Sequence, residues 1–272
     1  MRNNKYIKLN FRVDDDYLIV HTLASMGKDR FSSRKHQKNI LVFQNYAWKK
    51  HKPCYNLLVG RFSAIEIAKG GLQKTLKQLP DFLKELKASK QYKKIYRQTE
   101  EYLKFCERQW NDNYFVSSEA IEELTGLRLN KKFDVYITHP SLRNGSYRGS
   151  NTIEWGHNED WPNYATVYLW HEILHSYIGW SDKEHAIIEL IADEKLRTML
   201  NGGKYPPFVG HKHLKNIKQK VLLKWKKYLK SNKHNIRDFI KNPHDIFCNS
   251  INPTVPQEEK RFKVKKIRAA GY

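Results

Sequence analysis

The stretch LWHEILHSYIG, residues 169–179, places two histidines and a glutamate inside an otherwise apolar run. His171 and His175 are four residues apart, so on a helix their side chains stand on one face, one turn apart. Two imidazole nitrogens at that spacing can bind a single tetrahedral Zn²⁺. Glu172 lies one residue round from His171 and can reach a water beside that metal. The pattern H-E-x-x-H therefore predicts a zinc site in which Glu172 is the general base, with histidines that merely pack in a core as the alternative.

The next predicted helix carries the third candidate ligand. Glu189 and Asp193 lie one turn apart in E-L-I-A-D, and the apolar neighbours of Glu189 indicate that its charge is paired. A turn between the helices lets Glu189 supply a carboxylate oxygen opposite the imidazoles, while Asp193 accepts the N–H of one histidine. Glu184 and His185 are closer in sequence but fall in the opening turn of this helix, near the bend. Glu194 lies on a different face from Glu189.

These residues resemble the gluzincins, the zinc metallopeptidases typified by thermolysin and including the compact minigluzincins. The resemblance rests on HEILH followed by E-x-x-x-D and covers about a quarter of the chain, 131–200. The separation between the second histidine and the acid is shorter than in thermolysin-like enzymes, and no third histidine lies where metzincins keep theirs. The resemblance implies zinc as cofactor, Glu172 as the catalytic residue, Asp193 as support for a histidine, and a ligand set of His171, His175 and Glu189.

The resemblance also implies an edge strand beside the motif helix, to which the substrate backbone adds as a further strand. NTIEWG is the candidate for this substrate-binding strand, with an ordinary hairpin strand as the alternative; its residues are Asn151, Thr152, Ile153, Glu154, Trp155 and Gly156. Such an enzyme also needs a donor to the oxyanion that forms on the attacked carbonyl. The favoured donors are His211 and His213 of GHKH, and the other candidates are Tyr177 and Tyr205.

The remaining patterns predict an α+β fold. The resemblance implies that its catalytic domain is zincin-like, with an active-site helix, a ligand-bearing helix and a small mixed sheet. We expect strands at 5–13, 17–23, 131–140 and 151–156, and a loop at 143–150. We expect helices at 64–87, 92–110, 117–127, 160–178, 182–200 and 214–228. The chain then divides into a largely helical N-terminal region of unclear role, 1–90, a metallopeptidase core, 91–232, and a basic, partly disordered C-terminal segment, 233–272.

The charge of the chain is large and unevenly spread. Of 272 residues, 50 are Lys or Arg and 28 are Asp or Glu, a net charge of +22. The segment 139–200 nevertheless holds five basic and nine acidic residues, which suits a cation site. The basic remainder leaves open a nucleic-acid-associated protein with a structural or vestigial metal site, or a peptidase that acts on DNA-bound proteins. Trp225 and Tyr228 among the lysines of 224–230 support that alternative, although a solvated amphipathic helix is the favoured interpretation.

Other features bound the setting of the protein. The three cysteines form no C-x-x-C pair, no stretch is apolar enough to span a membrane, and the N-terminus lacks the pattern of a signal peptide. We therefore expect a cytoplasmic enzyme without a membrane partner; its oligomeric state is not set by the sequence. The predicted function is a zinc-dependent peptidase that hydrolyses peptide bonds of a protein or peptide substrate by metal-activated water.

Overall fold

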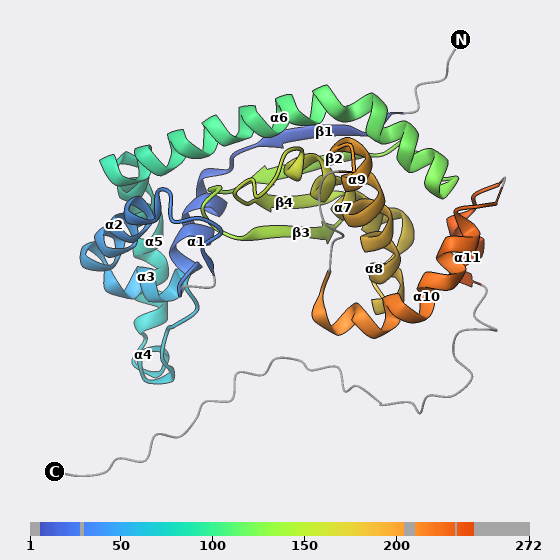
Figure 1. Cartoon of the computed structure of the whole chain (residues 1–272). Coiled ribbons are helices and arrows are strands. Elements are labelled where there is room, and N and C mark those ends of the chain that lie inside the picture. Colours follow the sequence, from blue (N-terminus) through green and yellow to red (C-terminus); the bar gives the residue numbers. More distant parts are fainter. Residues whose placement is uncertain (1–5, 28–29, 204–209, 232, 242–272) are drawn as a thin grey trace.

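The protein has an α+β fold that is mostly helical around one small sheet (Figure 1). The structure is a computed structural model, and it describes residues 6–27, 30–203, 210–231 and 233–241. Most of the predicted C-terminal segment, 242–272, therefore lies outside the described residues, together with Tyr205 and Cys248. None of the helices in the described part combines the length and the apolar character that a membrane crossing requires.

The sheet has four strands in the order β1-β2-β4-β3, which are Lys8–Arg12, Lys132–Ile137, Thr152–Gly156 and Asn144–Gly149. β1, β2 and β4 are parallel, and β3 runs antiparallel to β4. Because side chains alternate between the faces of a strand, Phe133, Val135 and Ile137 of β2 all point into the core. β1 comes from the region 1–90, so that region contributes a strand to the same sheet.

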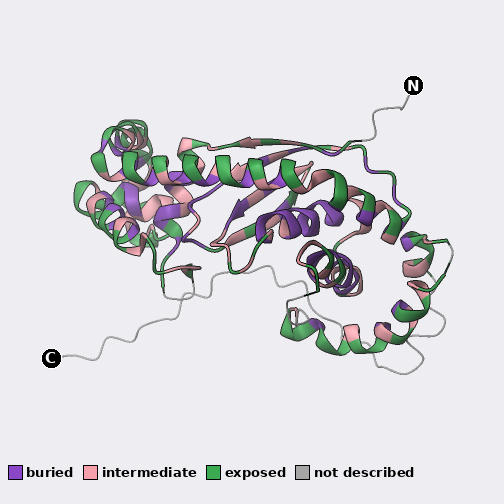
Figure 2. Cartoon of the chain, turned by 45° about the horizontal axis from the view of Figure 1, so that its top comes forward, coloured by how far each residue is buried: buried purple, intermediate pink, exposed green. Residues whose placement is uncertain are grey.

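Two helices cover the apolar face of the sheet. The long helix α6, Lys90–Thr125, packs against β1 and β2, and α7, Tyr164–Ile178, packs against β3 and β4. They meet at Trp110 and Trp170, whose ring centroids lie 5.1 Å apart and whose side chains are buried. Figure 2 shows buried residues gathered on the strands and on the helix faces turned toward them. Burial of these large aromatic surfaces is the main stabilisation of this core.

The N-terminal helices form a second buried cluster beside the sheet. They are α1 Asp15–Ala24, α2 Gln37–Lys50, α3 Lys52–Leu58 and α5 Gly71–Ala88; the short helix α4, Ala64–Ala68, has no buried residue and is not part of the cluster. The predicted strand at 17–23 is wrong, because this stretch lies in α1. Asp14 caps the helix by accepting a hydrogen bond from the backbone N–H of Tyr17 at 2.8 Å, and two further aspartates occupy the first turn. A short, mainly apolar run does not show whether its period is that of a helix or of a strand, and here the N-cap marks it as a helix.

The C-terminal part continues from α7 through a series of short helices. They are α8 Asp182–Ile188, a π-helical segment Glu189–Leu196, α9 Arg197–Leu200, a 3-10 turn Lys212–Leu214, α10 Lys215–Tyr228 and α11 Ile236–Lys241. The first three follow one another without a break, which confirms the single helix predicted over 182–200 but adds a widened π-helical stretch. The predicted capping box at Ser181 and Glu184 is confirmed.

Two further predictions are corrected by the structure. The helices expected at 92–110 and 117–127 are one continuous helix, α6, since Ser117 bonds back to the carbonyl of Asn113 rather than capping a new helix. The loop expected at 143–150 is largely strand β3. Its glycines and serine favour a loop locally, but pairing with β4 and packing against α7 supply the contacts that a strand needs.

Candidate metal centre and catalytic cleft

The motif helix α7 carries the two motif histidines on one buried face. His171 and His175 have ring centroids 5.1 Å apart, and both side chains are almost fully buried. Nδ1 of His171 lies 2.9 Å from Asp193 Oδ2, and Nδ1 of His175 lies 2.9 Å from the carbonyl oxygen of Gly179. In each ring Nδ1 is bonded to an oxygen, so Nε2 is the nitrogen that can bind a metal once any proton on it has been displaced. Both imidazoles are therefore held in the tautomer that can bind a metal through Nε2.

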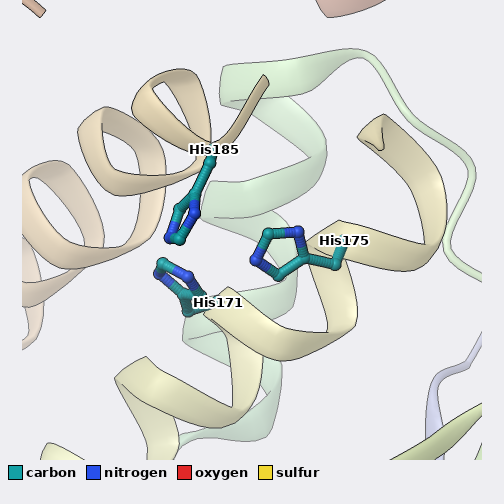
Figure 3. Close-up of side chains that lie close together, drawn as sticks. All are labelled: His171, His175 and His185. Atoms are coloured by element: carbon teal, nitrogen blue, oxygen red, sulfur yellow. The ribbon is translucent and has the colours of Figure 1, made fainter. Parts of the chain in front are cut away.

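A third histidine joins this pair. The ring centroid of His185, on α8, lies 5.0 Å from that of His171 and 4.9 Å from that of His175. One nitrogen from each of the three rings lies within 4.8 Å of the other two, and the rings converge in Figure 3. The short link after α7 ends at the capping box, so α8 begins close beside α7 and its opening turn faces the motif. His185 was not predicted as a ligand because it lies near this bend, although the bend itself brings the residue to the cluster.

The three imidazoles differ in their electrostatic surroundings. Burial lowers the pKa of His175 to about 4 and that of His185 to about 3, so both rings are neutral near pH 7. Burial acts in the same direction on His171, but the negative charge and hydrogen bond of Asp193 outweigh it and raise the pKa of His171 to about 9. The pKa of Asp193 itself is raised by its burial. The cluster thus offers two neutral rings and one ring held by a buried carboxylate.

Glu189, the predicted third zinc ligand, lies in the π-helical segment and is fully buried. Its Oε1 accepts hydrogen bonds from the backbone N–H of His211 at 2.8 Å and from His211 Nδ1 at 2.6 Å, and its Oε2 lies 3.1 Å from Lys218 Nζ. Glu189 groups with His185 and His211, not with the motif pair, among the potential metal-binding clusters of the described residues. Its assignment as a zinc ligand stays a prediction.

Glu172 points from α7 toward strand β3. Its Oε2 accepts a hydrogen bond of 2.7 Å from the backbone N–H of Tyr147, and the side chain is buried. Burial raises the pKa of Glu172, and the neighbouring His171 reduces this effect. A carboxylate whose pKa moves toward neutrality beside a metal-binding cluster is suited to general acid–base chemistry.

A cleft of about 510 Å³ opens over these residues. His171 and Glu172 line it, as do Trp155, His211 and three arginines. His211 therefore reaches the cleft, whereas His213 is exposed and is not one of the lining residues. Of the other oxyanion candidates, Tyr177 uses its hydroxyl to accept hydrogen bonds from the backbone N–H groups of 130 and 131.

The edge strand predicted for substrate binding is wrong. Residues 151–156 coincide with β4, which pairs with β2 on one side and β3 on the other, so its backbone cannot accept another strand. The edge beside α7 is β3, the segment predicted to be a loop. Trp155 of β4 still reaches the cleft through its side chain. The misassignment follows from β3 being rich in glycine, serine and arginine, a composition that conceals a strand.

Trp180 covers the histidine cluster from outside. Its ring stacks on His175 at a centroid distance of 4.8 Å and on Tyr147 at 5.2 Å, although more than half of the residue is exposed. The contact ties the turn between α7 and α8 to strand β3, so the two helices and the edge strand are held around one point.

No family model matches the chain, and neither a curated protein nor a solved structure is significantly similar to it.

Proposed function

We propose that the protein is a zinc-dependent peptidase of the zincin type, in which Glu172 is the general base. The observation that carries the proposal is that His171, the buried carboxylate of Glu172 and residues of the edge strand β3 line one cleft, with the ring of His175 5.1 Å from that of His171. Acyl transfer to water needs these three elements together: a metal site, a base beside it and a surface that aligns the substrate.

The residues present fit a zinc ion. Imidazole is a ligand that zinc prefers, and the Nδ1 contacts of His171 and His175 leave their Nε2 atoms available on the same side of α7. The Nε2 atom of His185 is buried and has no hydrogen-bond partner, so a metal would satisfy a polar atom that is otherwise unpaired. Bound zinc supplies a Lewis acid that polarises a carbonyl and lowers the pKa of water.

Glu172 accepts the proton that the attacking water loses and then delivers it to the leaving amine. Its hydrogen bond from the Tyr147 N–H fixes Oε2, which leaves Oε1 as the atom that faces the reaction. Since this N–H belongs to β3, the base and the substrate-aligning strand are in direct contact. A substrate backbone that pairs with β3 would be placed next to Glu172 by the same strand.

The cleft also has a basic wall. Arg30, Arg143 and Arg148 line it, and Glu172 is the only carboxylate among its lining residues. Arg143 donates its backbone N–H to the carbonyl of Arg30 at 2.8 Å, so these two arginines are neighbours, while Arg148 is paired with Glu154 at 2.6 Å. The wall favours substrates that carry acidic side chains near the scissile bond.

The test compares the wild type with Glu172→Gln on a denatured protein and on quenched fluorescent peptides, after zinc content has been measured in both. We expect Glu172→Gln to keep its zinc and to lose at least about 100-fold in rate, the typical contribution of a general base. Glu107→Gln, which changes an exposed carboxylate on α6, is the matched control and should cleave like the wild type. Equal cleavage by Glu172→Gln and wild type would refute the proposal.

The nucleic-acid alternative now rests on charge alone. Trp225 is buried, and the ring of Tyr228 already packs on Trp225 at a centroid distance of 5.2 Å and on Phe239 at 4.9 Å, so both aromatic rings are engaged within the protein. Retention on DNA that falls steeply with salt would favour that alternative and, together with cleavage, a peptidase that acts on DNA-bound proteins.

A further inference from the structure

We propose that His185 is the third protein ligand of the metal and that Glu189, the acid implied for that role, instead positions His211 at the cleft. The inference rests on the metal site of the proposed function, but it does not depend on the reaction that the site performs.

The position of His185 is determined by the start of α8. Ser181 accepts a hydrogen bond from the backbone N–H of Glu184 at 3.3 Å, and Glu184 Oε2 accepts from the backbone N–H of Ser181 at 2.8 Å. This reciprocal cap fixes the first turn, so the ring of His185 projects toward α7 from the next position. A rigid support of this kind is what a metal ligand requires.

The nitrogen atoms of the three rings surround a common point. One from each of His171, His175 and His185 lies within 4.8 Å of the others, and Figure 3 shows the rings directed toward one another. The Nε2 of His185 is buried without a hydrogen-bond partner. An unpaired buried nitrogen costs free energy unless something binds it, and a cation between the three rings would do so. Three imidazoles with an open fourth position form a recognised catalytic zinc arrangement.

Glu189 is already occupied by other partners. His211 donates two hydrogen bonds to Oε1, and Lys218 places its ammonium 3.1 Å from Oε2. The backbone also closes over the carboxylate at Gly210, where φ is +73° and an added Cβ would overlap Oε2. The carboxylate is therefore enclosed by His211, by the ammonium of Lys218 and by backbone, and although Oε2 has no hydrogen-bond partner, a metal that bound there would have to displace the lysine.

The enclosed carboxylate instead orients His211. Because Nδ1–H of His211 donates to Glu189, the other ring nitrogen is left to face the cleft that Glu172 also lines. In the neutral ring this leaves Nε2 as an acceptor at the cleft, and only the protonated ring can donate from Nε2–H to a carbonyl oxygen there; in both cases Glu189 is the positioning residue.

The experiment measures zinc affinity by competition with a chromophoric chelator, and the visible spectrum of the cobalt-substituted protein. Four variants of the full chain are compared: His171→Gln, His185→Gln, Glu189→Gln and, as a matched control, the exposed His213→Gln. We expect His185→Gln to lose affinity as His171→Gln does, by more than the 10- to 100-fold typical of residues outside the ligand set. Glu189→Gln and His213→Gln should stay within about 10-fold of the wild type and keep its cobalt spectrum.

The positioning role has its own measurement. Nitrogen-15 NMR of the zinc-loaded protein should show His211 protonated at Nδ1 in the wild type and should lose that preference in Glu189→Gln, whatever the protein cleaves. If Glu189→Gln does not fold by circular dichroism, His211→Gln removes the same contact and should likewise retain zinc.

Two outcomes would overturn the inference: loss of zinc from Glu189→Gln with retention by His185→Gln, or an unchanged His211 tautomer in Glu189→Gln. If zinc binds through three histidines but Glu172→Gln cleaves as well as the wild type, the proposed function fails while this inference stands.

Discussion

Replacing Asp193 with asparagine should make the stability of the metal-free protein depend differently on pH. Asp193 raises the pKa of His171 from its ordinary 6.5 to about 9 across a hydrogen bond of 2.9 Å. One pKa unit corresponds to about 1.4 kcal/mol, so the protonated pair stabilises the folded state by about 3 kcal/mol. Both groups are almost fully buried, so little of this is lost to solvent screening.

The sign follows from proton linkage. Below pH 6.5 His171 is protonated in both the folded and the unfolded state, and the full contribution is present. Between pH 6.5 and about 9 the unfolded chain loses this proton first, so the contribution falls as pH rises and is gone above about pH 9. Asp193→Asn removes the charge that holds the proton. The unfolding free energy of the wild type minus that of Asp193→Asn is the quantity to compare. We expect this difference to be about 3 kcal/mol larger at pH 6 than at pH 10.

Urea unfolding in the presence of a chelator, at both pH values, measures this difference. Asp182→Asn, an exposed carboxylate in the first turn of α8, is the control and should shift stability by much less, and equally at both pH values. A wild-type advantage over Asp193→Asn that is the same at pH 6 and pH 10, or larger at pH 10, would refute the assigned pairing.

Three further predictions concern stability and specificity. Burial lowers the pKa of His139 to about 3, so the unfolded chain takes up its proton first, and this residue alone should lower stability by about 2–3 kcal/mol between pH 6.5 and 4.5. His21, His175 and His185 also contribute to the loss over that range, and urea unfolding of His139→Asn should show a loss smaller by the His139 share. Gly156→Ala should lower the unfolding free energy by about 1–3 kcal/mol, measured by urea unfolding, because its Cβ would overlap the side chain of Thr138. If the basic wall selects acidic substrates, replacing both Arg30 and Arg143 with glutamine should lower kcat/KM on glutamate-containing peptides by about 10-fold and leave neutral peptides unaffected.

The sequence predicted correctly those features that depend only on residues close together in one helix. The spacing of His171 and His175 places both rings on one face of any helix, and the capping pattern at Ser181 marks the start of the next helix whatever its tertiary surroundings. The mixed α+β character also followed from the sequence, because strand and helix periods differ. These features depend on the geometry of neighbouring residues along the chain.

The sequence patterns gave the wrong secondary structure where contacts with segments distant in sequence determine it. The stretch 17–23 does not show its period clearly, and it packs as helix α1 against α2, α3 and the distant α6, although the cap at Asp14 is a local signal that could have identified it. The polar stretch 143–150 becomes a strand because β4 pairs with it. Because this strand pairs with β4, the edge of the sheet is β3 and not β4, and β3 is the strand whose backbone can pair with a substrate.

The sequence by itself determined that two imidazoles and a carboxylate share one helix, because four residues make about one helical turn. Only the tertiary structure decided which other residues join them. His185 comes to the cluster through the angle between α7 and α8, and Glu189 turns to His211 and Lys218 because the chain from Gly210 onward folds over it. Such contacts depend on how helices pack, and residue spacing carries no information about that angle.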